Sequence, residues 1–111
     1  MNILVVGDVH GCYHTLKKLL DENWNREEEL LVQVGDLIDR GNYAPETVEY
    51  ARELQEKYGA VFLKGNHEAL MIQNFRVAES PGWLRQGGFM TIAQYAFVER
   101  DVETDLQWFE K

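Results

Sequence analysis

Short apolar runs alternate with amphipathic segments over the first part of the chain. Three runs, at residues 3–6, 30–34 and 60–63, are almost wholly apolar, and each is followed within two residues by a glycine. Continuous apolar runs of this length are typical of strands that are buried on both faces of a sheet. The pattern therefore predicts three buried strands.

The segments between these runs carry apolar residues at helical spacing. The first stripe consists of Tyr13, Leu16, Leu19 and Leu20, and the second, which follows Pro45 at a first-turn position, consists of Val48, Ala51, Leu54 and Tyr58. Strands and helices in this alternating order form a parallel sheet with crossover helices. We therefore expect an α/β fold whose ligand site lies just beyond the carboxyl ends of the strands.

After the third run the pattern becomes mainly helical. We expect a helix through residues 70–78, a break at residues 80–82, a turn at residues 87–88 and a helix near residues 91–98. The last segment is predicted to open at Thr104, which stands in capping-box spacing with Gln107. No low-complexity stretch or long linker divides the chain, so residues 1–111 are predicted to form one domain.

Composition narrows the chemistry that this domain can perform. The formal net charge of -8 argues against a broad nucleic-acid or acidic-membrane surface, because clustered Lys and Arg bind phosphate backbones. Cys12 is the single cysteine, which excludes a disulfide or a thiolate zinc cluster within one chain, and we expect it to be a small buried hydrophobe. No apolar run approaches the ~20 residues that span a bilayer, and no signal-peptide pattern follows Met1, so we expect a cytoplasmic protein.

Unusual polar residues gather directly after the three apolar runs. The loops read Gly-Asp-Val-His-Gly at 7–11, Gly-Asp-Leu-Ile-Asp-Arg-Gly at 35–41 and Gly-Asn-His-Glu at 65–68. Each loop alone admits an ordinary interpretation: a turn with a capping Asp8, a solvated salt-bridged turn at residues 39–40, or Asn66 capping a helix beside a surface His67. The ordered set instead predicts carboxylate, imidazole and amide ligands that converge on shared cations, with Arg40 as a planar fork for phosphate oxygens.

This ordered set resembles the signature of the calcineurin-like metallophosphoesterases. The residue pairs 40–41 and 67–68 resemble the phosphoprotein phosphatase branch, in particular its bacterial and phage serine/threonine phosphatases and the symmetrical diadenosine tetraphosphatases. A looser resemblance to bacterial members covers residues 83–91. The resemblance implies the first half of a four-layer α/β/β/α sandwich. It also implies hydrolysis of a phosphoserine or phosphothreonine monoester, or of a phosphoanhydride, by two-metal activation of water.

The resemblance further implies a role for each loop residue. The metal ligands would be Asp8, His10, Asp36 and Asn66, with Asp36 shared by both ions; His67 would be the general acid, oriented by Asp39; Arg40 and Asn66 would bind the substrate phosphate. The cofactors would be two divalent metal ions, manganese before iron or zinc. The expected partners are a phosphorylated protein or a small phosphate or nucleotide substrate, with no membrane.

The chain departs from the family in its second half. The family supplies two further metal-binding histidines and another arginine, whereas this chain has only His10, His14 and His67, and His14 is expected at the surface. Lys111 falls where the second sheet of the family would begin, so we expect a truncated domain of doubtful activity with an apolar sheet face exposed. Self-association could cover that face. The alternative function is a non-catalytic module that binds phosphate or a partner.

Overall fold

Parallel pairing of three strands organises the computed structural model, which describes residues 2–111. The elements of this part are β1 (Asn2–Val6), α1 (Tyr13–Asn23), β2 (Glu29–Gln33), α2 (Ala44–Tyr58) and β3 (Val61–Phe62). The strands lie in the order β1-β2-β3, with Leu4 opposite Leu31 and Gln33 opposite Phe62. The predicted α/β fold with crossover helices is confirmed, although the third strand is shorter than its apolar run.

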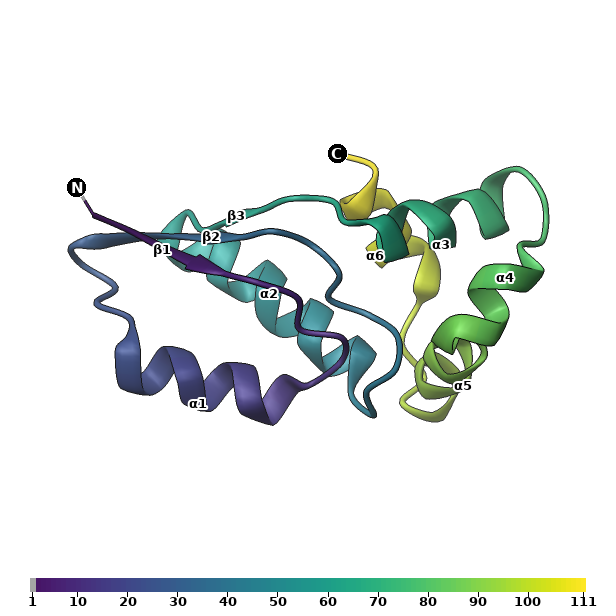
Figure 1. The fold of residues 1–111 in the computed structure, drawn as a ribbon, viewed down its shortest axis with the longest axis horizontal. Coiled ribbons are helices and arrows are strands. Elements are labelled where there is room, and N and C mark those ends of the chain that lie inside the picture. Colours follow the sequence, from purple (N-terminus) through teal and green to yellow (C-terminus); the bar gives the residue numbers. More distant parts are fainter. Residues whose placement is uncertain (1) are drawn as a thin grey trace.

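Both crossover helices cover the same face of the sheet (Figure 1). Leu16 and Leu20 of α1 and Val48 and Leu54 of α2 are buried beneath it, which is the packing that their helical spacing predicts. The first turn of α2 contains Pro45, as expected.

The other face of the sheet is largely open. Ile3 and Val5 of β1 are 60% and 62% exposed, whereas Val6, which points to the helices, is buried. The prediction of strands buried on both faces is therefore wrong for β1, because both crossover helices lie on one side. The expectation of an exposed apolar sheet face is confirmed.

The rest of the described chain is helical. It consists of α3 (Asn66–Arg76), α4 (Pro81–Trp83), a kinked turn η1 (Leu84–Gly88), α5 (Phe89–Phe97) and α6 (Val102–Phe109). The predicted break at 80–82 is instead the start of α4, because Pro81 suits a first helical turn. The predicted turn at 87–88 is a kink between two helical segments, where Gly87 adopts φ 117°. None of the helices in residues 2–111 has the length and apolarity needed to cross a membrane.

Buried and exposed ion pairs attach α6 to the other helices. Asp105, which is fully buried, accepts hydrogen bonds from Tyr95, Arg100 and Arg52 at 2.7–2.8 Å.

Helix α6 begins after Asp101, whose side chain accepts from the Glu103 amide, so the predicted capping box at Thr104 is wrong. Asp101 reaches a free amide of the first turn, which is the usual function of an N-cap carboxylate.

Candidate metal and phosphate site

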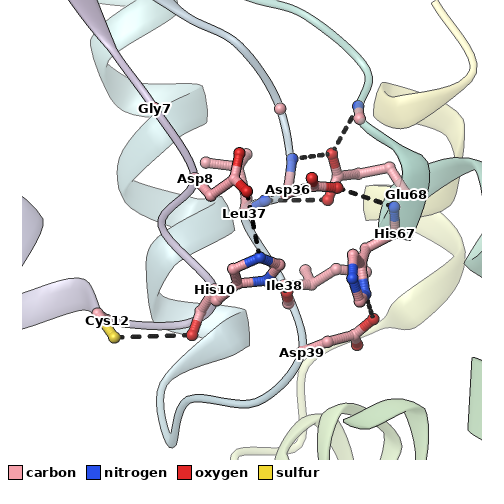
Figure 2. A network of polar contacts seen from close by, with 12 residues as sticks. Gly7, Asp8, His10, Cys12, Asp36, Leu37, Ile38, Asp39, His67 and Glu68 are labelled. Carbon is pink, nitrogen blue, oxygen red and sulfur yellow. Dashed lines mark hydrogen bonds and ion pairs between the residues drawn. The ribbon is translucent and has the colours of Figure 1, made fainter. Parts of the chain in front are cut away.

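The three polar loops meet at the carboxyl ends of the three strands. Amides of His10 and Gly11 in the first loop donate to the carbonyls of Asp36 and Leu37 in the second, at 2.9 and 2.7 Å. The amide of His67 in the third loop donates to the Asp36 carboxylate at 2.9 Å. Figure 2 shows the side chains of all three loops gathered in one place. Parallel pairing explains this convergence, because it brings successive strand ends to one edge of the sheet.

Three of the predicted metal ligands form a compact donor cluster. One ligand atom from each of Asp8, His10 and Asp36 lies within 4.8 Å of the others. His10 Nδ1 is 3.0 Å from the Ile38 carbonyl, which can only accept, so Nδ1 carries the proton and Nε2 is left with a lone pair. That Nε2 lies 3.6 Å from Asp8 Oδ2. Two carboxylates and an imidazole oriented by a carbonyl fit a divalent cation.

A cavity of about 510 Å³ opens beside this cluster. Its lining includes all the predicted ligands and two of the other predicted site residues: Asp8, His10, Asp36, Asn66, Arg40 and His67. Arg40 and Asn66 are exposed. Asn66 is the first residue of α3 and Gly65 is the N-cap, so the interpretation of Asn66 as a helix cap is wrong.

Asp39 is buried behind the cavity rather than solvated. It is 0% exposed and lies 2.6 Å from His67 Nδ1, 2.6 Å from Trp83 Nε1 and 2.6 Å from Thr91 Oγ1. His67 itself is 7% exposed, and its ring lies edge-on to that of His10, with 4.8 Å between the ring centroids. The interpretations of residues 39–40 as a salt-bridged surface turn and of His67 as a surface residue are therefore wrong.

Glu68 connects the second and third loops through its carboxylate. It accepts from the amides of Asp36 at 2.7 Å, Leu37 at 3.0 Å and Gly65 at 2.9 Å. Burial raises the pKa of Glu68 above its ordinary value, while the three amides act in the opposite direction by stabilising the ionised form. All three contacts are donated by backbone amides, so the Glu68 oxygens act only as acceptors in them, which favours the ionised carboxylate. It thereby fixes the backbone that presents Asp36.

Strained backbone is concentrated in the same loops. Within residues 2–111, four of the five non-glycine residues with positive φ belong to them: His10 at 47°, Asp36 at 58°, Asp39 at 73° and Arg40 at 73°. Such conformations are unfavourable for residues with a Cβ and persist where surrounding structure imposes them, most often at functional sites. Apolar periodicity contains no signal for this strain.

A model of the calcineurin-like phosphoesterase family matches residues 1–110 of the chain. The chain belongs to the calcineurin-like phosphoesterase family. This membership agrees with the donor cluster and with the order of the three loops along the sequence. It confirms the resemblance that the loop motifs indicate.

Relatives in this family include named phosphatases. The chain is 39% identical over 88 residues to serine/threonine-protein phosphatase 1 of Salmonella typhimurium, covering 78% of this chain and 39% of that protein. It is 41% identical over 69 residues to the symmetrical bis(5'-nucleosyl)-tetraphosphatase of Hamiltonella defensa, covering 61% of this chain and 24% of that protein. The chain thus spans less than half the length of the curated relatives that it matches.

Solved structures reproduce the same fold. The crystal structure of a metallophosphoesterase from Sphaerobacter thermophilus superposes with a TM-score of 0.67 at 22% identity, over 100% of this chain and 41% of that one. A cold-active protein tyrosine phosphatase superposes with a TM-score of 0.62 at 27% identity, over 93% of this chain and 32% of that one. In both structures the arrangement seen here is therefore part of a larger chain.

A buried glutamine that joins the first and second loops is absent from the predicted site residues. Gln33 is buried at the end of β2, where its amide nitrogen donates to the carbonyls of Gly7 and Gly35 and its oxygen accepts from the Gly35 amide. A lone glutamine inside an apolar run is the sequence signal for this role.

His14 is exposed, as predicted. Cys12 is also exposed, so its predicted burial is wrong, because the first loop turns outward there.

Proposed function

We propose that this chain supplies the metal-binding and phosphate-binding part of a phosphatase that hydrolyses a phosphate monoester or a phosphoanhydride. The observation that carries the proposal is the cluster of Asp8, His10 and Asp36, which opens on one cavity together with Arg40 and His67. Family membership supports the reaction class. A cytoplasmic location stays a prediction.

Asp8, His10, Asp36 and Asn66 would hold two divalent cations, manganese before iron or zinc. When bound, such a pair of ions lowers the pKa of a water molecule and neutralises charge on a phosphoryl group. Asp36 is suited to a shared position because its backbone is fixed by Glu68 and one of its carboxylate oxygens by the His67 amide.

His67 would give a proton to the leaving oxygen of the substrate. Its Nδ1 is bonded to Asp39, so Nε2 is the nitrogen free to hold the proton, and the side chain lines the cavity. A buried carboxylate behind an imidazole stabilises the protonated ring and fixes its orientation. Asp39 would therefore act on the reaction through His67.

Arg40 would bind the substrate phosphate, with Asn66 beside it. A guanidinium presents a planar fork of donors that matches two phosphate oxygens. The Arg40 side chain is exposed at the cavity, where an arriving phosphate can reach it.

The substrate class is proposed from the relatives. Their names include a serine/threonine-protein phosphatase and a symmetrical bis(5'-nucleosyl)-tetraphosphatase. We propose a phosphoserine or phosphothreonine monoester first, because the phosphatases match a larger share of this chain, and a dinucleoside polyphosphate second.

Hydrolysis of 4-nitrophenyl phosphate with added Mn²⁺ tests the proposed function. We expect a low rate for the wild-type chain, no activity for Asp36→Asn, and a wild-type rate for Asp21→Asn. The control carries the same chemical change at an exposed residue whose ion pairs lie on the surface. Equal rates for wild type and Asp36→Asn would overturn the proposal, and a chain that neither turns over nor binds metal would favour the non-catalytic module.

A further inference from the structure

The carboxylate of Asp39 receives hydrogen bonds from three different elements. Oδ2 is shared by His67 Nδ1 of α3 and Trp83 Nε1 of α4, and Oδ1 accepts from Thr91 Oγ1 of α5. All four side chains are buried. The indole and the hydroxyl carry no charge, so they satisfy the carboxylate without competing with His67 for an ionic partner.

The backbone between Trp83 and Thr91 is shaped to deliver both donors to one carboxylate. A Cβ added to Gly87, which has φ 117°, would lie 2.7 Å from the backbone nitrogen of Arg40 and 3.0 Å from the Asp39 Cβ. A Cβ added to Gly88 would lie 2.6 Å from the Trp83 ring. Two adjacent glycines thus allow the kink to press against the second loop, where a larger residue would hold the segment away.

We propose that Trp83 and Thr91 are positioning residues for His67. Held from both sides, Asp39 has one orientation, in which Oδ2 faces His67 Nδ1 and the imidazole turns Nε2 to the cavity. Without these donors the buried carboxylate keeps one strong partner and is free to rotate about its last torsion, and the His67 ring loses its fixed direction. The catalytic consequence rests on the proposed function of His67 as a proton donor, whereas the orientation of the ring does not.

Matched variants separate positioning from packing. Thr91→Val keeps the shape of the side chain and removes the hydroxyl, while Thr91→Ser keeps the hydroxyl. Trp83→Phe removes the indole N–H and retains an aromatic ring at this buried place. If the hydroxyl matters only as packing volume, Thr91→Val should resemble wild type more closely than Thr91→Ser does.

The first experiment observes the His67 ring directly by NMR of the ¹⁵N-labelled full chain. The sequence has three histidines, so a His67→Gln spectrum assigns the resonance. In wild type and Thr91→Ser we expect a downfield Nδ1 proton that exchanges slowly with water. In Thr91→Val and Trp83→Phe we expect this signal to be lost by exchange, while the dispersion of the amide signals shows that the protein is still folded. A proton retained in both of these variants would overturn the proposal, and so would its loss in Thr91→Ser alone.

The second experiment uses the leaving group to detect proton donation. Phenyl phosphate has a poorer leaving group than 4-nitrophenyl phosphate and depends more on a general acid. Thr91→Val and Trp83→Phe should lower kcat for phenyl phosphate by about tenfold and kcat for 4-nitrophenyl phosphate by much less, with KM unchanged. An equal loss on both substrates would refute the catalytic part. A wild type without metal-dependent turnover would instead refute the proposed function. The NMR experiment alone would then test whether Trp83 and Thr91 orient the His67 ring.

Discussion

Replacing Glu68 by Gln removes the charge that ties the second and third loops together, while the size of the side chain barely changes. The amide oxygen of Gln can keep the two bonds now made by Oε1, to the amides of Asp36 and Gly65. Its NH₂ group then faces the Leu37 amide, which now donates to Oε2 at 3.0 Å. One buried donor is thereby left without an acceptor, and two charge-assisted bonds become neutral ones.

The expected loss of stability follows from these contacts. An orphaned buried donor costs about 1–3 kcal/mol, and each bond that becomes neutral loses about 1 kcal/mol. Burial of the Glu68 charge is itself unfavourable, which is why burial raises the pKa of this group. Removing the charge therefore offsets part of the cost. The free energy of unfolding should therefore fall by about 2–4 kcal/mol, which for a chain of this size lowers Tm by on the order of 10–20 °C.

Urea unfolding at neutral pH measures this loss, with Glu56→Gln as the control. Glu56 is exposed on α2, so the same chemical change there should alter stability by less than about 0.5 kcal/mol. Glu68→Gln should also weaken Mn²⁺ binding, because it releases the backbone of Asp36. A Glu68→Gln protein within about 0.5 kcal/mol of wild type, with unchanged Mn²⁺ affinity, would refute the role assigned to this carboxylate.

Two further predictions concern the surface. Arg76 holds the pKa of Glu103 and Glu110 below their ordinary value of 4.5, so its contribution to stability is present at neutral pH and is lost as pH falls and both carboxyls are protonated. Wild type should unfold with a larger free energy than Arg76→Gln at pH 7, and the difference should vanish in acid; a difference that grows in acid would contradict the pairing. The open sheet face at Ile3 and Val5 predicts self-association, which light scattering at micromolar concentration should detect and Val5→Lys should weaken. A strictly monomeric wild type under those conditions would remove that prediction.

Periodicity predicts the fold, and loop order predicts which polar side chains lie at one edge of the sheet. Apolar runs that alternate with amphipathic helices predict a parallel sheet, and parallel pairing then brings Asp8, Asp36 and Asn66 to one edge of the sheet. These features are local in sequence or follow from one rule of topology.

The features that sequence did not predict depend on partners far away in the chain. The run that forms β1 has the same apolar composition whether one face of the sheet is covered or two, so the run predicts burial on both faces, and only the family resemblance predicts the exposed face that contains Ile3 and Val5. Trp83 is an apolar residue by composition, and only the folded chain brings its N–H to Asp39, 44 residues earlier. The cap of α6 is a local exception: the prediction of a cap at Thr104 is wrong because Asp101, three residues earlier, accepts from the first-turn amide of Glu103.

Binding of Mn²⁺, measured by electron paramagnetic resonance, tests most directly whether the three loops share cations. Wild type and Glu22→Gln, a change at an exposed residue of α1, should bind Mn²⁺ with the same affinity. Asp36→Asn should lose at least tenfold in affinity, since it removes the carboxylate that lies among the donors of the first loop. Equal Mn²⁺ binding by wild type and Asp36→Asn would contradict a metal site at these strand ends.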